Sequence, residues 1–447
     1  MSFPRYPAYK DSGVEWLREV PQDWQVKKFR HLFRESIEKI EREIVGSMLS
    51  VSGYRGVEVK EYDDDNRRRL DEDLLGYRIA RVGQLVVNTM WLNYAGLGVT
   101  EYEGHVSPAY RSYDIAEGLE RRYVHHLLRS GIYVQGYTQL LTGIRPNSLQ
   151  MSRDDLMEFP VLVPSSREQL LIAAFLDCET AKIDALVAEQ RRLIDLLAEK
   201  RKAVISHAVT KGLNPDAPMK PSGVEWLGDV PAHWELKSLR HSITKIEQGW
   251  SPTCENEPAA EDDWGVLKVG CGNRDEFDPT EQKALPRDVD PLTAYEIRTG
   301  DILMSRGNTR SLVGMATFVP RVRPRLLLSD LLYRFRAKPE LAEGKFLVLC
   351  LRSLNARFQI EREATGTSPS MKKIGQGVIR GLFIAMPPFD EQREIVTFIH
   401  AETARFDALT AEAQRAIDLL QERRDALISA AVTGQIDVRG LVETVAA

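Results

Sequence analysis

Ser12-Gly-Val-Glu-Trp-Leu17 occurs a second time in this chain, as Ser222-Gly-Val-Glu-Trp-Leu227. The repeat continues downstream, where Val20-Pro21-x-x-Trp24 matches Val230-Pro231-x-x-Trp234. Three further pairs belong to the same segment: Lys27 and Lys237, Arg30 and Arg240, and His31 and His241. The chain therefore contains two copies of one opening frame.

A second frame closes each copy. Its matched stretches are Ile183-Asp-Ala-Leu186 with Phe406-Asp-Ala-Leu409, Ile194-Asp-Leu-Leu197 with Ile417-Asp-Leu-Leu420, and Ala208-Val-Thr210 with Ala431-Val-Thr433. The inserts between the frames, residues 25–160 and 235–385, are alike in length but barely in sequence. Two matched frames around two unmatched inserts indicate one scaffold that carries two different recognition elements.

The opening frame predicts a short helix and then a strand. Ser12 and Ser222 each stand three residues before a glutamate, which is the spacing of a capping box. Pro21 and Pro231 then end the helix. Trp24 and Trp234 begin the strands, and we expect both to anchor the core rather than bind a ligand.

The closing frame predicts a long helix in each copy. Ser165 and Glu168 form another capping box, and no Pro or Gly interrupts the chain from there to Thr210. The second helix should run from about Asp390 to Thr433. Near-heptad seam positions are Ile183, Leu186, Gln190, Leu193, Leu197, Lys200 and Val204 in the first helix and Phe406, Leu409, Ala413, Ala416, Leu420 and Leu427 in the second.

Each long helix needs a partner for its apolar stripe. The matching helix is the obvious one, so we predict an intramolecular antiparallel coiled coil; the alternative is that each helix packs on its own domain. A helix of ~42 residues is ~63 Å long. The segment from Lys211 to Pro221, with Gly212, Pro215 and Pro218, is a linker between the copies.

The inserts are expected to be mixed α/β. Residues 82–88 and 299–305 share a turn followed by a buried strand, and Thr142-Gly143 matches Thr365-Gly366. The inserts should therefore share a fold and differ in surface.

Composition excludes several classes of protein. Apolar residues make up 43% and charged residues 28% of 447 residues, as in soluble globular proteins. The longest apolar runs are too short to span a bilayer, and the N-terminus lacks the apolar core of a signal peptide, so we expect a cytoplasmic protein. The net charge of −5 excludes a globally basic DNA binder. Four cysteines without C-x-x-C pairing are expected to be reduced thiols.

The repeated Ser-Gly-Val-Glu-Trp-Leu-x-x-Val-Pro-x-x-Trp motif, the Asp-Ala-Leu helices, Pro388-Phe-Asp-Glu-Gln392 and Met304-Ser-Arg-Gly-Asn308 resemble the specificity subunits of type I restriction–modification systems. The resemblance covers essentially the whole chain and depends most on the duplicated arrangement. It implies an α+β fold: two similar target-recognition domains in a pseudo-twofold arrangement, joined by two long antiparallel helices. The implied parts are residues 1–163 (first recognition domain), 164–211 (first long helix), 212–387 (linker and second recognition domain) and 388–447 (second long helix and tail).

The resemblance also implies partners. Each recognition domain would read one half of a split site in double-stranded DNA. Two modification subunits would dock on the helices and use S-adenosylmethionine to methylate adenine, and restriction subunits would supply ATP- and Mg-dependent cleavage. The chain itself would hold no cofactor or metal. Site symmetry mirrors protein symmetry, so two non-identical recognition domains predict a bipartite, asymmetric site with half-sites about one turn, ~34–36 Å, apart.

Motifs for catalysis are weak. Met386-Pro-Pro-Phe389 resembles the loop of amino-methyltransferases, but a methionine cannot supply the required hydrogen bond. Glu58-Val-Lys60 and Glu281-Gln-Lys283 are chance-level halves of a nuclease metal site, and there is no phosphate loop. His125-His126 is expected to be a surface or packing pair rather than a metal site. No catalytic residue is predicted.

Base reading requires Arg, Lys, Asn or Gln, and phosphate contacts require basic or hydroxyl side chains. In the first insert the candidates are Tyr54, Arg55, Arg67, Arg68, Arg69, Asn93, Tyr94, Arg111, Tyr137, Thr138 and Gln139. In the second insert they are Asn273, Arg274, Arg306, Asn308, Thr309, Arg310, Arg321, Arg323, Arg325, Thr367, Ser368, Ser370, Lys372 and Lys373. For each cluster a merely solvated loop stays an alternative.

Two rival interpretations of the whole chain are compatible with the sequence. One is a self-contained methyltransferase or nuclease with a recognition domain attached. The other is a coiled-coil scaffold without a DNA role. Methylation of DNA by the chain alone would favour the first, and the absence of sequence-selective binding when modification subunits are added would favour the second.

Overall fold

The structure is a computed structural model that describes residues 3–53, 55–62, 71–143, 149–254, 256–366 and 371–441. The chain divides into two compact units. Unit 1 contains residues 1–191 and 414–447, and unit 2 contains residues 192–413. No helix in the described ranges is long and apolar enough to cross a membrane.

Two long helices contribute to both units. They are α4 (Ser166–Lys211) and α8 (Phe389–Val432), so the predicted bounds are confirmed to within one or two residues. The Ser165 capping box is also confirmed, because the Glu168 amide donates to Ser165 Oγ and the Ser165 amide donates to Glu168 Oε2, both at 3.3 Å.

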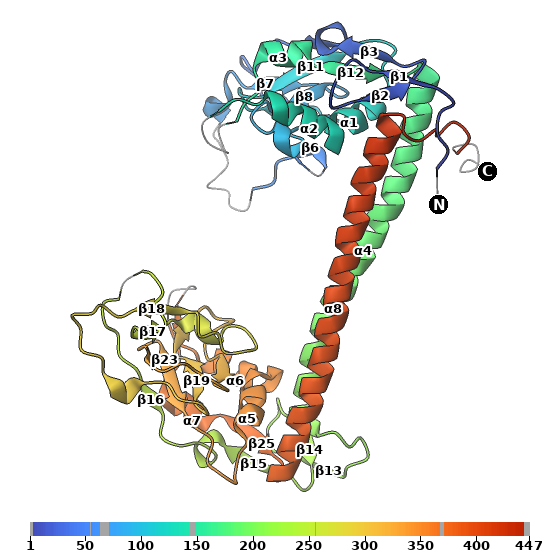
Figure 1. The fold of residues 1–447 in the computed structure, drawn as a ribbon. Coiled ribbons are helices and arrows are strands. Elements are labelled where there is room, and N and C mark those ends of the chain that lie inside the picture. The colour runs from blue at the N-terminus through green and yellow to red at the C-terminus, as the bar shows by residue number, and fades with distance from the viewer. Residues whose placement is uncertain are drawn as a thin grey trace. The chain divides into compact units, whose positions relative to one another are not determined.

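Within each unit, one half of α4 packs against one half of α8 in the antiparallel direction (Figure 1). In unit 1 Asp184 pairs with Arg424 at 3.1 Å. In unit 2 Arg201, further along α4, pairs with Asp407, which lies earlier on α8. The partner moves back along α8 as α4 advances, as an antiparallel pair requires. The predicted coiled coil is confirmed.

The seam of the helix pair alternates steps of four and three residues. Its buried or half-buried positions are Leu176, Thr180, Ile183, Val187, Gln190, Ile194, Leu197, Arg201, Val204 and Ala208 on α4, and Phe406, Thr410, Ala413, Ile417, Leu420, Arg424, Leu427 and Ala431 on α8. The prediction is wrong at Leu186, Leu193, Lys200, Leu409 and Ala416. Each stands one residue before a seam position, because the four-residue step along the seam passes over it; the first four are exposed and Ala416 is half-buried.

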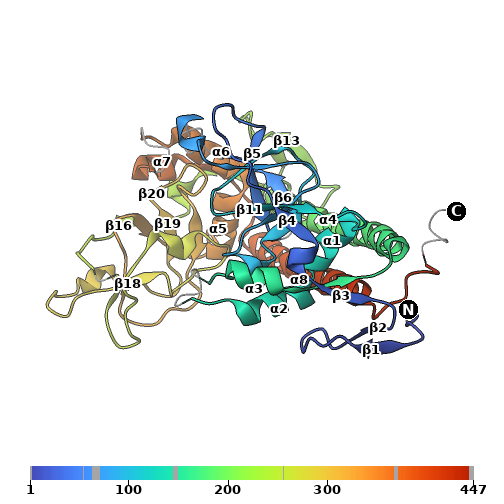
Figure 2. The same ribbon diagram turned by 90° about the horizontal axis from the view of Figure 1, so that it is seen from above.

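The opening frame forms a hairpin in each unit, and the predicted short helix is wrong. The hairpins are β1 (Tyr9–Asp11) with β2 (Glu19–Pro21), and β13 (Met219–Pro221) with β14 (Asp229–Pro231). Figure 2 shows β1 and β2 beside the N-terminus. Ser12 donates its amide to the Arg18 carbonyl at 2.8 Å, and Gly13 adopts a φ of +72°, so the segment closes as a turn before a helix can form.

Each hairpin leads to a fully buried tryptophan at one end of the helix pair. Trp24 donates its indole N–H to Glu168 on α4 at 3.4 Å, and Trp234 donates to Glu391 on α8 at 3.0 Å. Both side chains are 0% exposed, which confirms the prediction that they are core anchors.

The insert of unit 1 contains a two-stranded and two four-stranded sheets. The two-stranded sheet is β12 (Pro160–Val163) with β3 (Gln25–Lys28). One four-stranded sheet has the order β4 (Phe33–Glu35), β11 (Arg111–Ile115), β8 (Leu85–Val87), β9 (Leu97–Val99). The other has the order β6 (Gly56–Val59), β5 (Ser47–Ser52), β10 (Gly104–Val106), β7 (Arg78–Ala80). The helices are α1 (Arg121–Arg129), α2 (Gly131–Leu140) and α3 (Arg153–Glu158), with 3-10 turns η1 (Phe29–His31), η3 (Asp71–Leu74) and η4 (Leu92–Tyr94).

The insert of unit 2 has a similar plan, with a three-stranded sheet in place of one four-stranded sheet and one additional two-stranded pair. β15 (Glu235–Ser238) pairs with β25 (Phe383–Met386), and a four-stranded sheet has the order β16 (Glu247–Gln248), β23 (Leu332–Phe335), β19 (Ile302–Ser305), β21 (Ala316–Phe318). A three-stranded sheet has the order β18 (Gln282–Ala284), β17 (Gly265–Leu267), β22 (Leu326–Leu327). In addition, β20 (Gly307–Asn308) pairs with β24 (Lys372–Lys373). The helices are α5 (Gly344–Arg352), α6 (Leu354–Glu363) and α7 (Gln376–Gly381), with 3-10 turns η6 (Leu239–His241), η7 (Val269–Gly272) and η8 (Thr293–Tyr295).

The equivalence of the inserts is clearest at their central strands. β8 and β19 are buried throughout and each follows a glycine with positive φ, Gly83 at +86° and Gly300 at +89°. β8 lies between β11 and β9, and β19 lies at the same position between β23 and β21. The shared turn and buried strand predicted from residues 82–88 and 299–305 are therefore confirmed.

All four cysteines are free, as predicted, and Cys271 and Cys350 are buried. Burial raises the pKa of the Cys271 thiol to about 12.

Candidate functional site

The connection that follows the central strand of each insert carries several of the predicted residues. In unit 1 it joins β8 to β9, and in unit 2 it joins β19 to β21. We name these connections loop A (residues 88–96) and loop B (residues 306–315).

In loop A, Tyr94 is 58% exposed, whereas Asn93 is half-buried and its Oδ1 is buried without a hydrogen-bond partner. The turn before β6 lies against loop A and presents Arg55, whose exposed guanidinium pairs with Glu58 at 3.1 Å. Arg111 lies on β11, 3.7 Å from Glu35. The structure therefore brings Arg55 and Tyr94 into one region.

The predicted cluster on α2 is less accessible. Tyr137 is buried, and its hydroxyl donates to the Leu128 carbonyl at 2.9 Å, so this side chain belongs to the core. The Thr138 hydroxyl is exposed but donates to Val134 within the helix. Gln139 is exposed. Tyr54, Arg67, Arg68, Arg69, Thr367, Ser368 and Ser370 lie outside the described residues.

Loop B gathers predicted residues from three segments. Asn308 donates its side-chain amide to Asn273 Oδ1 at 3.2 Å, and β20 pairs Asn308 with Lys372 and Gly307 with Lys373. Thr309 is exposed and follows directly. We call these five residues, Asn273, Asn308, Thr309, Lys372 and Lys373, the Asn308 cluster. It combines two amides, a hydroxyl and two cations, which are the groups that can bond to base edges and phosphates.

Three further predicted arginines border the Asn308 cluster. Arg306 precedes it, and its guanidinium lies 3.5 Å from the Asp330 carbonyl. Arg310 is 73% exposed and lies 3.7 Å from Glu361, and Arg274 is 85% exposed and 4.0 Å from Asp278. Exposed pairs at such distances contribute little, so both guanidinium groups can exchange partners at small cost.

The basic run at Arg321, Arg323 and Arg325 lies beside an acidic segment, residues 261–263. Arg323 donates to the carbonyls of Glu261 and Asp263 at 3.0 and 3.1 Å, and Arg325 donates to the Asp262 carbonyl. An acidic segment distant in sequence thus packs beside this run. Arg323 and Arg325 hold that segment, and Arg321 is exposed.

An arginine that is not among the predicted residues holds loop A. Arg129, the last residue of α1, donates to the carbonyls of Ala95 and Leu97 at 3.0 and 2.6 Å and to those of Ser52 and Gly53 at 3.2 and 2.8 Å. One guanidinium therefore fixes both loop A and the turn that carries Arg55. Burial, together with the charge of Arg424, lowers the pKa of Arg129 to about 10, so the group stays charged at neutral pH.

Unit 2 has the equivalent arginine. Arg352, the last residue of α5, donates to the carbonyls of Gly272 and Ala316 at 3.3 and 2.9 Å and pairs with Asp275 at 3.0 Å. Arg357 adds bonds to the carbonyls of Val313, Arg310 and Ser311 in loop B. Burial lowers the pKa of both groups. The sequence does mark the two arginines as equivalent, because Leu128-Arg129-Ser130 recurs as Leu351-Arg352-Ser353. Each triplet stands at the same distance before its Thr-Gly pair, Thr142-Gly143 or Thr365-Gly366.

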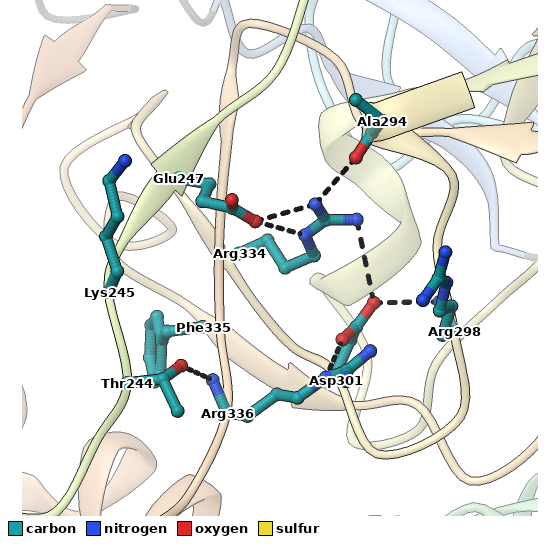
Figure 3. Close-up of a pocket in the computed structure, with 9 residues that line it drawn as sticks. All are labelled: Thr244, Lys245, Glu247, Ala294, Arg298, Asp301, Arg334, Phe335 and Arg336. Carbon is teal, nitrogen blue, oxygen red and sulfur yellow. Dashed lines mark hydrogen bonds and ion pairs between the residues drawn. The ribbon is translucent and has the colours of Figure 1, made fainter. Parts of the chain in front are cut away.

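A pocket of about 360 Å³ in unit 2 is formed by other residues (Figure 3). Arg334 lies between Glu247 at 2.6 Å, the Ala294 carbonyl at 2.9 Å and fully buried Asp301 at 3.9 Å, and Arg336 bonds to Asp301 at 2.6 Å. None of the predicted DNA-contacting residues lines it. These ion pairs tie β16, β19 and β23 together, so we assign the cluster a role in holding the sheet.

The weak catalytic motifs have other partners. Glu58 pairs with Arg55, and Lys283 donates to Asn256 at 3.2 Å. Met386 ends β25, just before α8. His126 bonds to Asp177 on α4 at 2.8 Å, which confirms a packing role for that histidine. In the part of the chain that the structure describes, no group of three or more His, Cys, Asp or Glu side chains could hold a metal ion.

The fold and the site define a class of protein: two copies of one recognition insert, different in their loops, on a shared helical scaffold. Comparisons with known proteins show what this chain is similar to. The specificity subunit of the type I restriction enzyme EcoEI from Escherichia coli is 32% identical over 206 residues, which is 46% of this chain and 34% of that protein. The EcoKI specificity subunit from E. coli K12 is 23% identical over 325 residues, 72% of this chain and 67% of that protein.

The aligned regions thus span about a third of the first relative and about two thirds of the second. No protein-family model matches the chain. Among solved structures, the HsdS subunit of Thermoanaerobacter tengcongensis aligns with a TM-score of 0.50 and 16% identity, over 93% of this chain and 98% of that one. A chain from a study of assembly and conformational transition of the type I restriction–modification system aligns with a TM-score of 0.60 and 16% identity, over 93% and 99%. The chain is thus similar in sequence to specificity subunits of type I restriction enzymes, and it shares its fold with the two solved chains.

Proposed function

We propose that this chain is the DNA-specificity subunit of a type I restriction–modification complex. Unit 1 reads one half of a bipartite, asymmetric DNA site through loop A and its neighbours, and unit 2 reads the other half through loop B and the Asn308 cluster. The observation that carries the proposal is the contrast between these loops. They follow equivalent strands of the same sheet and are held by equivalent arginines, yet their side chains differ in chemistry.

The proposal is consistent with the charge of the chain. A net charge of −5 gives no general attraction to DNA, so binding depends on local groups. In unit 2 the Asn308 cluster, with Arg274, Arg306 and Arg310 around it, concentrates cations and amides in one region.

We further propose that α4 and α8 dock two modification subunits and set the spacer between the half-sites. Both helices expose large apolar side chains away from their seam, which supports a docking role: Leu186, Leu193 and Leu196 on α4 and Leu409 and Leu419 on α8 are 40–65% exposed. The modification subunits supply S-adenosylmethionine-dependent methylation of adenine. Restriction subunits, where present, supply ATP- and Mg-dependent cleavage, and this chain supplies no catalysis.

The test is enrichment from a library of random DNA duplexes by the full chain, alone and with its modification subunits. The expected result is two short specified blocks separated by a fixed number of unspecified positions. Asn308→Ala should relax one block and leave the other intact, whereas Arg287→Ala, at a 90% exposed side chain outside the cluster, should change neither. Enrichment of no sequence, or methylation by the chain without partners, would contradict the proposal.

A further inference from the structure

Loop A exposes a group of large apolar side chains. Met90, Trp91 and Tyr94 are 41%, 52% and 58% exposed, and the rings of Trp91 and Tyr94 lie 5.8 Å apart with a tilt of 59°. Isolated exposed hydrophobic residues are common, but an adjacent group of this size marks a contact surface. Because the two rings do not stack on each other, each keeps a face for a ligand.

The backbone of loop A holds these rings in place. The Trp91 carbonyl accepts the amides of Tyr94 and Gly96 at 2.9 and 2.8 Å, and the Trp91 amide donates to Asn88 at 3.0 Å. A Cβ on Gly96 would lie 2.6 Å from the Trp91 carbonyl oxygen, so only glycine fits there. Arg129 also bonds to the carbonyls of Ala95 and Leu97, so the loop that presents the two rings is preorganised.

The chemistry of the ligand follows from comparing equivalent places in the two units. Loop B has no aromatic residue and presents Asn308, Thr309 and Arg310. Loop A presents two aromatic rings, and the turn that carries Arg55 lies against Tyr94, because a Cβ on Gly53 would be 2.6 Å from the Tyr94 carbonyl oxygen. A ligand that meets amides and cations at one copy of the surface and aromatic faces at the other carries both negative charge and flat rings. Nucleic acid has both.

We propose that Trp91 and Tyr94 act as a stacking wedge that partly unstacks one base step in the half-site read by unit 1. This inference rests on the proposed function and adds the mode of contact. Aromatic side chains that enter a base step give up water contact and gain base stacking, while the DNA kinks. Pyrimidine–purine steps unstack most easily, so the wedge favours such a step through its deformability. Unit 2 instead reads through hydrogen bonds.

The experiment uses the duplex enriched in the library selection, with 2-aminopurine in place of one base at a time across both half-sites. The fluorescence of 2-aminopurine rises when it unstacks. The assembled complex should raise the signal at one step of the unit 1 half-site. Trp91→Ala should abolish that rise and weaken binding roughly 5- to 150-fold, the effect of losing one base–aromatic stack, whereas Trp91→Phe should keep most of both.

Tyr102→Ala is the matched control, since Tyr102 is a 46% exposed aromatic on another loop of unit 1 and should change neither signal nor affinity. Signals in the unit 2 half-site should be the same in every variant. Selective binding of the enriched duplex without a Trp91-dependent rise would overturn the wedge and leave the proposed function standing. Unchanged affinity of Trp91→Ala would do the same. Failure of the unaltered complex to select any duplex would overturn both proposals.

Discussion

Replacing Arg129 with methionine tests whether one guanidinium holds loop A and the turn that carries Arg55. Methionine keeps most of the apolar stem and removes all four carbonyl bonds. The Gly53 carbonyl is near the surface and can regain water. The Ala95 carbonyl keeps the Leu97 amide as a second donor at 2.7 Å. Most of the loss therefore falls on the 2.6 Å bond to the Leu97 carbonyl.

A hydrogen bond to a charged group contributes about 1.5–3 kcal/mol, and the weaker bonds add part of that amount, so we expect a loss of about 2–4 kcal/mol in the stability of unit 1. Urea unfolding measures this loss, and hydrogen exchange of the amides at 91–97 should speed up with it. Arg122→Met on the same helix is the control: that side chain is 52% exposed, and its pairs with Glu120 and Asp177 should contribute less than about 1 kcal/mol. An equally small effect for Arg129→Met, with unchanged exchange, would refute the assignment.

Three other outcomes are expected. Replacing Arg306, Asn308 and Arg310 with alanine should weaken recognition of one half-site by about 1–3 kcal/mol per lost bidentate contact in a competition assay; unchanged selectivity would remove loop B from the interface. Burial, followed by the charge of Arg129, lowers the pKa of His125 to about 3, so the unfolded chain binds more protons below pH ~6.5. Stability should therefore fall by about 1 kcal/mol between pH 7.5 and 5.5, and His125→Gln should lose this dependence in urea titrations. Helical insertions of equal length near Ala188 and at the facing position of α8 should lengthen the spacer in the enriched motif, and an unchanged spacer would show that the helices do not set it.

The duplicated frames predict the helices, their antiparallel pairing and the tryptophan anchors, because heptad spacing and caps are local signals that depend on few distant contacts. Features that depend on contacts with residues distant in the chain, such as the opening hairpin and the exact seam positions, are not predicted correctly. Ser12 and Glu15 carry capping-box spacing, but pairing of β1 with β2 closes the segment as a hairpin. The seam shifts by one residue at Leu186 because packing against α8, and not residue size, selects Val187.

The candidate site shows the same division. Loop B could be predicted because Arg, Asn and Thr after a buried strand are visible in the sequence. The repeated Leu-Arg-Ser marks the position of Arg129, but its role could not be predicted, since its partners are carbonyl groups, which carry no sequence signature. Trp91 is not predicted, because tryptophan usually anchors a core, as Trp24 does. The basic run at Arg321–Arg325 is predicted to contact DNA, but in the structure Arg323 and Arg325 bond to an acidic segment. That segment lies far away in the chain, so the run alone does not reveal it.

The most direct test of the two-recognition-domain account is a map of methylated adenines in cells that express this chain. Single-molecule sequencing of DNA from cells that express the chain with its modification subunits, compared with cells that lack it, gives that map. The account predicts one bipartite, asymmetric motif with a spacer of fixed length and free sequence, present only with the chain. A single contiguous or palindromic motif, or methylation that does not depend on the chain, would contradict it.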